Sequence, residues 1–442
     1  MTTVRKIYLF LAGILLTAVS CTKDDFALHP QRGGFTEGEP LPARGVTRET
    51  RKVLLLYSAG FNSLHSYLDQ NLEELSTGFI PGKGRNDDVL LVFSHTTAGG
   101  YGVPTAPVLV RLSSDGEGTV VQDTLRRWPA GMPVTEGSVL RDVLTFVRQE
   151  FPARSYGMLY SSHATGWLPP GYFTNQAPYE GSNRGSGTIW SSPVLRSIGQ
   201  EYYGDDLGGG TYASQEMSVR EMVEAIPYRL DYILFDCCLM GCVEIAYELR
   251  NVCGQVGFSP TEILAKGFDY TTLTGHLLGD GDPDPLGVCQ DYFARYADGK
   301  DGGATITLVD CAATAALAEA CRPLFDRYRT EIQGLDGRLL QRYDRTGSGK
   351  AYYCFFDLKD ILDQAGAAEE QLDAVQEALD GCILYLDHTD RFLSIPIERY
   401  CGLSMYLPAR ADGRADTYHG TPFLDRYYQE NLSWNDATEL VR

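Results

Sequence analysis

The residues YILFDCCLMGC, at positions 232–242, decide how the rest of the chain is interpreted. Their apolar start has the pattern of a buried parallel strand, and an acid and two cysteines follow directly. A helical pattern begins at once with Val243. A thiol at such a junction faces the N-terminal end of a helix, where backbone N–H groups and the helix dipole favour the thiolate. Nucleophilic catalysis needs a cysteine in that state, but Cys237 and Cys238 fit equally well as small buried hydrophobes.

Composition limits the class of protein. The 442 residues have the make-up of a globular domain and a formal net charge of −20, which argues against a nucleic-acid partner. Eleven cysteines show neither a disulfide framework nor paired Cys-x-x-Cys spacing, so we expect buried thiols and no metal cluster.

The N-terminus has the features of an export signal. Arg5 and Lys6 precede an apolar run, Ile7–Val19, that is too short to span a bilayer, and Ser20 and Cys21 follow. Residues 1–20 are therefore predicted to be a signal peptide. They resemble the lipobox of bacterial lipoproteins, with Ala18 where leucine is commonest, and this resemblance implies lipidation of Cys21. An ordinary signal peptide is the alternative.

The next segment is expected to be a tether. Residues 21–50 are rich in proline and glycine and poor in large apolar side chains. Thr22–Asp25 resembles the export signal of Bacteroidetes surface lipoproteins, which implies an outer-membrane protein exposed at the cell surface. Residues 51–442 are predicted to form the functional domain, and no later run is apolar enough to cross a membrane.

Strand and helix patterns alternate from residue 52 onward. This alternation predicts an α/β fold with a mostly parallel sheet and helices on both faces. Strands are expected at 52–57, 89–93, 157–161, 232–235, 255–259 and 304–309, and helices at 64–75, 139–147, 218–227, 313–328 and 369–384. The helix at 218–227 begins with a capping box formed by Ser218 and Glu221.

One interval breaks this rhythm. Residues 168–215 are rich in Gly, Pro, Ser, Asn and Tyr, without sustained periodicity. Such a long irregular stretch within a compact domain is usually functional or mobile.

Two of the predicted strands end in reactive groups. His163 follows the strand at 157–161, and Cys238 follows the strand at 232–235. Ligands bind at the carboxyl ends of the strands in open α/β sheets, so the two groups would meet if these strands are neighbours. An imidazole beside a thiol is what acyl transfer requires, whereas a lone histidine is more often a polar loop residue.

These residues resemble the clostripain family of cysteine peptidases (C11, clan CD). Ser162–Trp167 (SHATGW) resembles its His-Gly-x-Gly-Trp element, and Asp236–Gly241 (DCCLMG) resembles its Asp-Ala-Cys-Leu-Met-Gly element, in the same order. Weaker matches at Tyr57–Leu64, Ser259–Glu262 and Gly402–Pro408 extend the resemblance over most of the domain.

The resemblance implies a caspase-like α/β/α sandwich and a cysteine endopeptidase acting on protein or peptide substrates. Cys238 would be the nucleophile and His163 the general base and acid. The backbone N–H groups of Cys238 and Ala164 would stabilise the oxyanion, provided that Ala164 does not need a positive φ. Cys237 stands where the family usually has alanine and is the alternative nucleophile.

The resemblance also bears on specificity. It places Asp236 at the base of the S1 pocket, favouring arginine or lysine at P1, although a carboxylate that caps the strand end explains Asp236 equally well. Lys266 stands where relatives place an acid thought to assist S1, and it would repel cationic P1 groups. Phe61 replaces an aspartate typical of the first-strand loop.

Processing and calcium complete the implied properties. Family members are commonly cut between histidine and cysteine, where Arg184 and Arg196, or Asp205 and Asp206, are candidate sites. No cofactor is expected, but the family prototype depends on calcium. Asp280, Asp282 and Asp284 have calcium-loop spacing, but Pro285 and Asp291 break the EF-hand pattern, which favours a solvated turn before a helix.

Two other functions fit the same residues. Ala164, Phe61 and Lys266 also suit a catalytically silent member of this fold that acts as a binding or scaffold lipoprotein. A different thiol hydrolase, such as an amidase, would use the same cysteine and histidine.

Overall fold

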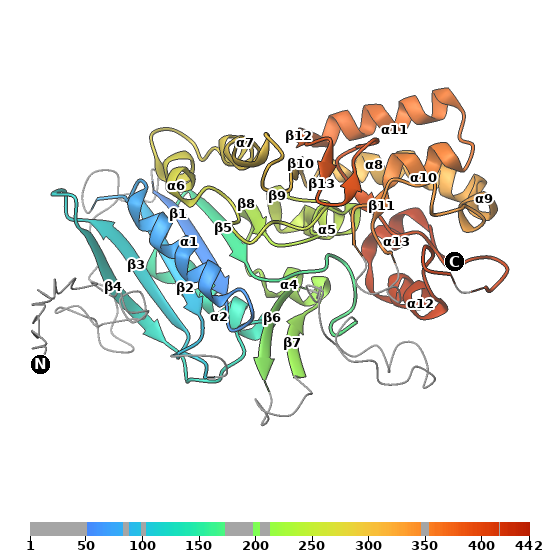
Figure 1. Cartoon of the computed structure of the whole chain (residues 1–442). Coiled ribbons are helices and arrows are strands. Elements are labelled where there is room, and N and C mark those ends of the chain that lie inside the picture. The colour runs from blue at the N-terminus through green and yellow to red at the C-terminus, as the bar shows by residue number, and fades with distance from the viewer. Residues whose placement is uncertain are drawn as a thin grey trace, which may run out of the picture.

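A nine-stranded sheet forms the centre of the protein in the computed structural model, which describes residues 51–82, 88–98, 103–172, 198–203, 213–345, 353–414 and 416–442 (Figure 1). Five adjacent strands are parallel, and antiparallel strands extend the sheet at both edges. In spatial order the strands are β12 (Ile383–His388), β10 (Thr305–Asp310), β9 (Cys253–Phe258), β8 (Leu230–Asp236), β5 (Ser155–Ser161), β1 (Lys52–Ala59), β2 (Val89–His95), β3 (Val108–Ser114) and β4 (Val120–Arg127).

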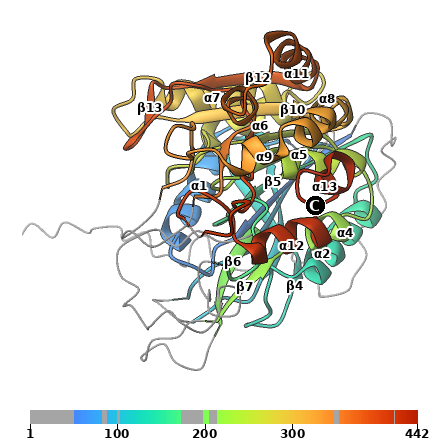
Figure 2. The ribbon, with the colours of Figure 1, turned by 90° about the vertical axis from the view of Figure 1, so that its right-hand side faces the viewer.

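Helices cover both faces of this sheet, because successive strand residues point to opposite faces. In β1, Val53, Leu55 and Tyr57 belong to one hydrophobic cluster, while Leu54 and Leu56 belong to another. The smaller cluster includes side chains of α1 (His65–Thr77), α6 (Tyr270–Leu278) and α7 (Pro285–Tyr296). Figure 2 shows α1 on one side of the sheet and α2 (Gly137–Glu150) and α4 (Val219–Ala225) on the other.

The larger cluster holds the remaining helices against the second face. It includes residues of α5 (Val243–Glu248), the short 3-10 helix η1 (Leu249–Asn251), α8 (Thr314–Arg327), α9 (Arg329–Gln333), α10 (Leu358–Gln364), α11 (Glu369–Cys382), α12 (Pro422–Asn431) and α13 (Ser433–Thr438), as well as α2 and α4. The predicted α/β/α sandwich with a mostly parallel sheet is therefore confirmed.

Three two-stranded pairs lie outside the central sheet. They are β6 (Ile198–Tyr203) with β7 (Ala213–Met217), β11 (Phe356–Asp357) with β15 (Ser404–Met405), and β13 (Arg391–Phe392) with β14 (Ile395–Pro396). β6 and the first residues of β7 lie within residues 168–215, so part of that interval is regular, contrary to the expectation from composition.

Several local features of the structure differ from the sequence predictions. The helix predicted to reach residue 384 ends at Cys382, and the chain continues as edge strand β12. Ser218 caps α4 by accepting the Glu221 N–H at 3.2 Å, but the Glu221 carboxylate accepts the Gly137 N–H at 2.9 Å instead of closing a capping box. The antiparallel strands β3 and β4 were not predicted.

The register between β5 and β8 is fixed by a close contact. Gly157 faces Tyr232 across the two strands, and a Cβ atom added to Gly157 would lie 1.9–2.3 Å from the Tyr232 phenol. Only glycine leaves room for this ring, which is itself buried. This pair therefore sets where the loops that follow β5 and β8 begin.

Candidate active site

His163 and Cys238 leave the sheet side by side. β5 and β8 are parallel neighbours in which Ser161 is paired with Asp236, and each reactive residue lies two positions beyond this pair. The expected adjacency of the two strands is thus confirmed. Because both strands run in the same direction, His163 and Cys238 lie at the same carboxyl edge of the sheet.

The two loops also pack against each other directly. Gly166, at φ +58°, lies so close to the cysteine loop that an added Cβ would be 2.6 Å from the Leu239 carbonyl oxygen. Leu239 itself has φ +60°, which is unusual for a branched residue. Its N–H donates to Thr261 O at 2.9 Å, and the Gly241 N–H donates to Ser259 O at 2.8 Å. These contacts hold the strained turn after Cys238 in place.

Cys238 is the one described cysteine that is not buried. Its thiol donates to the Ile263 carbonyl at 3.7 Å. Helix α5 begins at Val243, as predicted, with Cys242 as its N-cap. Desolvation, followed by the charge of Glu262, raises the pKa of Cys238 well above its ordinary value.

Cys237 points the other way. Its side chain is 1% exposed and donates to the Tyr160 carbonyl at 3.4 Å, within the larger hydrophobic cluster. Burial raises the pKa of Cys237 as well. Both cysteines lie in the turn after β8, but their thiols donate to carbonyls of different segments, those of Tyr160 and Ile263.

His163 is held by a residue that sequence reasoning missed. The Nε2 atom of its largely buried ring lies 2.9 Å from the hydroxyl oxygen of Ser63, in the loop after β1. The next residue toward the N-terminus, Ser162, donates its hydroxyl to Ala59 O at 2.7 Å. Ser63 lay within the weak match at Tyr57–Leu64, which was the only signal for it.

Asp236 ends β8 as a buried carboxylate. It accepts hydrogen bonds from the Tyr270 hydroxyl at 2.6 Å and the Ser161 hydroxyl at 3.3 Å, and Gly267 packs against it. Desolvation raises the pKa of Asp236 to about 6, against the lowering effect of these bonds. Lys266 is exposed and pairs with Asp301 at 3.0 Å, so a neighbouring carboxylate compensates its charge.

The other residues singled out by sequence lie around the same edge. Ala164 is buried, does not adopt a positive φ, and forms an isolated bridge with Ile198 of β6. Phe61 is buried with its ring centroid 5.4 Å from that of His95. Glu262 precedes Ile263, whose carbonyl accepts the hydrogen bond from the Cys238 thiol. Glu262 forms a bidentate ion pair with Arg345.

The β6–β7 hairpin, which lies between His163 and Cys238 in the chain, is fastened to this edge. Glu201 of β6 pairs with the buried His95 at the end of β2, and it accepts the Val134 N–H at 2.6 Å. Gln200 donates its N–H to the Ser162 hydroxyl at 3.2 Å. The candidate cleavage sites Arg184, Arg196, Asp205 and Asp206 lie outside the described residues.

The aspartates with calcium-loop spacing make other contacts. Asp284 caps α7 by accepting the Gly287 N–H at 2.9 Å, and Asp282 pairs with Arg154 at 2.7 Å. This turn before α7 is the solvated turn that sequence favoured. No group of three or more His, Cys, Asp or Glu side chains suited to a metal occurs in the part of the chain that the structure describes.

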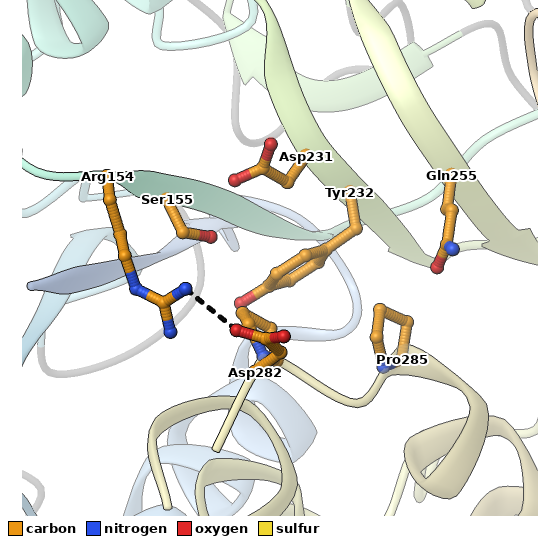
Figure 3. A pocket seen from close by; sticks show the side chains of 8 residues that line it. Arg154, Ser155, Asp231, Tyr232, Gln255, Asp282 and Pro285 are labelled. Carbon is orange, nitrogen blue, oxygen red and sulfur yellow. Dashed lines mark hydrogen bonds and ion pairs between the residues drawn. The ribbon is translucent and has the colours of Figure 1, made fainter. Parts of the chain in front are cut away.

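A pocket of about 320 Å³ lies at the opposite, amino edge of the sheet (Figure 3). It is lined by Arg154, Ser155, Asp231, Tyr232, Gln255, Asp282, Pro283 and Pro285. Arg154, Ser155 and Asp231 lie at the starts of β5 and β8, so the pocket is separated from His163 and Cys238 by the length of these strands.

A thiol and an imidazole at the carboxyl edge of a parallel sheet are the groups that a cysteine hydrolase uses. The model of the clostripain family (Peptidase C11) matches residues 207–439. This chain therefore belongs to the clostripain family of cysteine peptidases, a family of hydrolases. A comparison of the sequence with curated proteins gives no match.

Solved structures of similar fold cover nearly the whole domain. An inactive zymogen of a C11 protease from Parabacteroides distasonis is 26% identical, with a TM-score of 0.68 over 89% of this chain and 99% of that one. A secreted C11 cysteine protease from Bacteroides thetaiotaomicron, in complex with an irreversible peptide inhibitor, is 23% identical, with a TM-score of 0.65 over 88% and 99%. The latter likeness shows the fold alone.

Proposed function

We propose that this protein is a surface-anchored cysteine endopeptidase that cleaves protein or peptide substrates with Cys238 and His163. The observation that carries the proposal is the β5–β8 register, which brings both residues to one edge. The accessible thiol, in contrast to the nine buried ones among the described residues, supports Cys238 as the nucleophile. The peptide inhibitor bound to the Bacteroides thetaiotaomicron protease supports a peptide substrate.

In the proposed reaction His163 takes the proton from the Cys238 thiol, whose pKa is raised by desolvation and by the charge of Glu262. The thiolate attacks the scissile carbonyl carbon, and the N–H groups of Cys238 and Ala164 donate hydrogen bonds to the resulting oxyanion. His163 then passes its proton to the leaving amine as the C–N bond breaks, leaving a thioester. A water molecule, deprotonated by His163, attacks the thioester; collapse of that intermediate releases the acid product and returns the proton to Cys238.

For specificity we propose arginine or lysine at P1, recognised by Asp236. Its carboxylate is the acid at the end of β8, two residues before the nucleophile, and its Tyr270 and Ser161 partners orient it. The pairing of Lys266 with Asp301 supports this assignment, because it weakens the repulsion expected from an unpaired lysine.

Self-processing and anchoring are further parts of the proposal. Cleavage between His163 and Cys238, at Arg184 or Arg196 if P1 is basic, would leave the β6–β7 hairpin fastened through Glu201. Lipidated Cys21 would hold the protein at the outer membrane. No helix in the described residues has the length and apolarity to cross a bilayer. Labelling of wild type but not of Cys21→Ser by a radioactive fatty acid tests the anchor.

An irreversible thiol-directed peptidyl probe with arginine at P1 tests the catalytic proposal. We expect it to label wild type and Cys237→Ala but not Cys238→Ala, since only Cys238 is accessible. Folding of each variant is checked by its far-UV circular dichroism. Labelling lost only in Cys237→Ala would transfer the nucleophile to Cys237.

The rival function is a catalytically silent binding or scaffold lipoprotein. Phe61 and Lys266 motivate it, while the ordinary φ of Ala164 leaves its N–H compatible with an oxyanion hole. An absence of both labelling and peptide cleavage, with and without calcium and after limited proteolysis, would favour this rival.

A further inference from the structure

The loop after β1 lies against the histidine loop through a small polar cluster. Asn62 donates its side-chain amide to Ala59 O at 2.9 Å, to the Ser162 hydroxyl at 3.3 Å and to Gln200 O at 2.8 Å. Its own amide oxygen accepts the Leu64 N–H at 2.8 Å. Asn62 is buried, so these four bonds fix the backbone on both sides of Ser63.

Ser63 is positioned by this cluster to hold the imidazole of His163. It directly follows Asn62, and its hydroxyl oxygen lies 2.9 Å from His163 Nε2. Ser162, the residue before His163, is fixed in the same way by its hydrogen bonds with Ala59 and Asn62. Ser63 and His163 therefore each follow a residue that is held in place. A bond between two such anchored groups costs little further ordering entropy.

We propose that Ser63 is a positioning residue of the peptidase, which orients the His163 ring and stabilises its protonated form. This inference rests on the proposed role of His163. In this arrangement the Nε2–H group donates a hydrogen bond to the Ser63 hydroxyl oxygen, and Nδ1 is the nitrogen that exchanges a proton with Cys238 and with the leaving amine. An acceptor at Nε2 favours the imidazolium that forms when the thiol is deprotonated.

The exposure of Ser63 makes the proposal testable without disturbing the fold. Its side chain is exposed, so Ser63→Ala leaves no buried cavity. Ser66 is an exposed serine on the adjacent helix α1, and Ser66→Ala is the matched control. Ser63→Thr keeps the hydroxyl.

The experiment measures kcat/KM for an arginyl-P1 peptide between pH 5 and pH 9 in full-length wild type, Ser63→Ala, Ser63→Thr and Ser66→Ala. We expect Ser63→Ala to lose about 3- to 10-fold in kcat/KM, the scale of one partly exposed hydrogen bond to a charged group. Its acid limb should shift to lower pH, since the imidazolium loses an acceptor. Ser63→Thr should restore both values, and Ser66→Ala should match wild type.

Two outcomes are distinguishable. If wild type is active and the pH profile of Ser63→Ala coincides with that of Ser66→Ala, Ser63 has no positioning role and the proposal is overturned. If His163→Ala retains wild-type activity, the proposed dyad itself is wrong, whatever Ser63→Ala does.

Discussion

Cys237 and Cys238 are neighbours in sequence with different chemistry, because one side chain faces the sheet core and the other faces its carboxyl edge. The same contrast separates Asp236 from an ordinary surface acid. Burial raises its pKa to about 6, although the Tyr270 hydroxyl donates to it. Its charge state therefore changes within the range of pH in which a peptidase can be assayed.

At the residue scale we predict that the preference for basic P1 residues depends on pH. Asp236 is ionised above its pKa of about 6 and neutral below it, so the ratio of kcat/KM for arginyl-P1 over neutral-P1 peptides should fall as the pH drops from 8 to 5. In Asp236→Asn this ratio should be low and independent of pH. An unchanged ratio in Asp236→Asn would exclude Asp236 from P1 recognition.

At the scale of elements, the pairing of β5 with β8 is what brings the candidate site together. Gly157 accommodates the Tyr232 ring at their register pair, close to the amino edge of the sheet. A methyl group there would overlap the ring and push the two strands apart.

We therefore expect Gly157→Ala to lower the free energy of unfolding by about 1–3 kcal/mol, as overpacking does in tight cores. It should also slow labelling of Cys238, since His163 would move relative to the thiol. Gly381→Ala in α11 is the control, because an added Cβ meets no atom within 4 Å and helical alanine is favoured. Urea unfolding monitored by fluorescence measures the stability of both variants. Equal stability of the two would contradict the assigned role of Gly157.

At the scale of the whole molecule, one buried acid joins segments from distant parts of the chain. Glu244 in α5 is fully buried and accepts the Tyr406 N–H at 3.0 Å and the Tyr428 hydroxyl at 2.7 Å. Both tyrosine rings pack against Trp167 of the histidine loop. Glu244 thus links the segment after Cys238 to the C-terminal region and, through these rings, to the histidine loop.

This acid should make stability depend on pH. Burial raises the pKa of Glu244 from 4.5 to about 7, so its contribution is fully present below pH 4.5 and is lost as the pH rises through about 7. The unfolding free energy of wild type should fall between pH 4.5 and pH 8. We predict that this fall is smaller in Glu244→Gln by roughly 1–3 kcal/mol. Glu430→Gln, exposed on α12, should retain the wild-type pH dependence. Urea titrations at four pH values test this, and identical slopes for the two variants would refute it.

Much of the fold was predictable because its central strands carry strong local patterns. Continuous apolar runs identified β1, β2, β5 and β8, and reactive residues at two strand ends identified the carboxyl edge. The strands β3, β4 and β12 were missed or misassigned, because an edge or antiparallel strand has weaker periodicity and β12 directly continues a helix.

The family, the α/β architecture and the assignment of His163 and Cys238 as candidate site residues were predictable, since each depends on residue types at short spacing. The surroundings of these residues came from the fold. The fold shows which of two adjacent thiols is less buried, that desolvation raises the pKa of Cys238, that Ser63 contacts His163 across 100 residues, and that the Tyr270 hydroxyl donates to Asp236. Burial, pKa and hydrogen-bond partners arise from groups that are distant in the chain, so no local pattern encodes them.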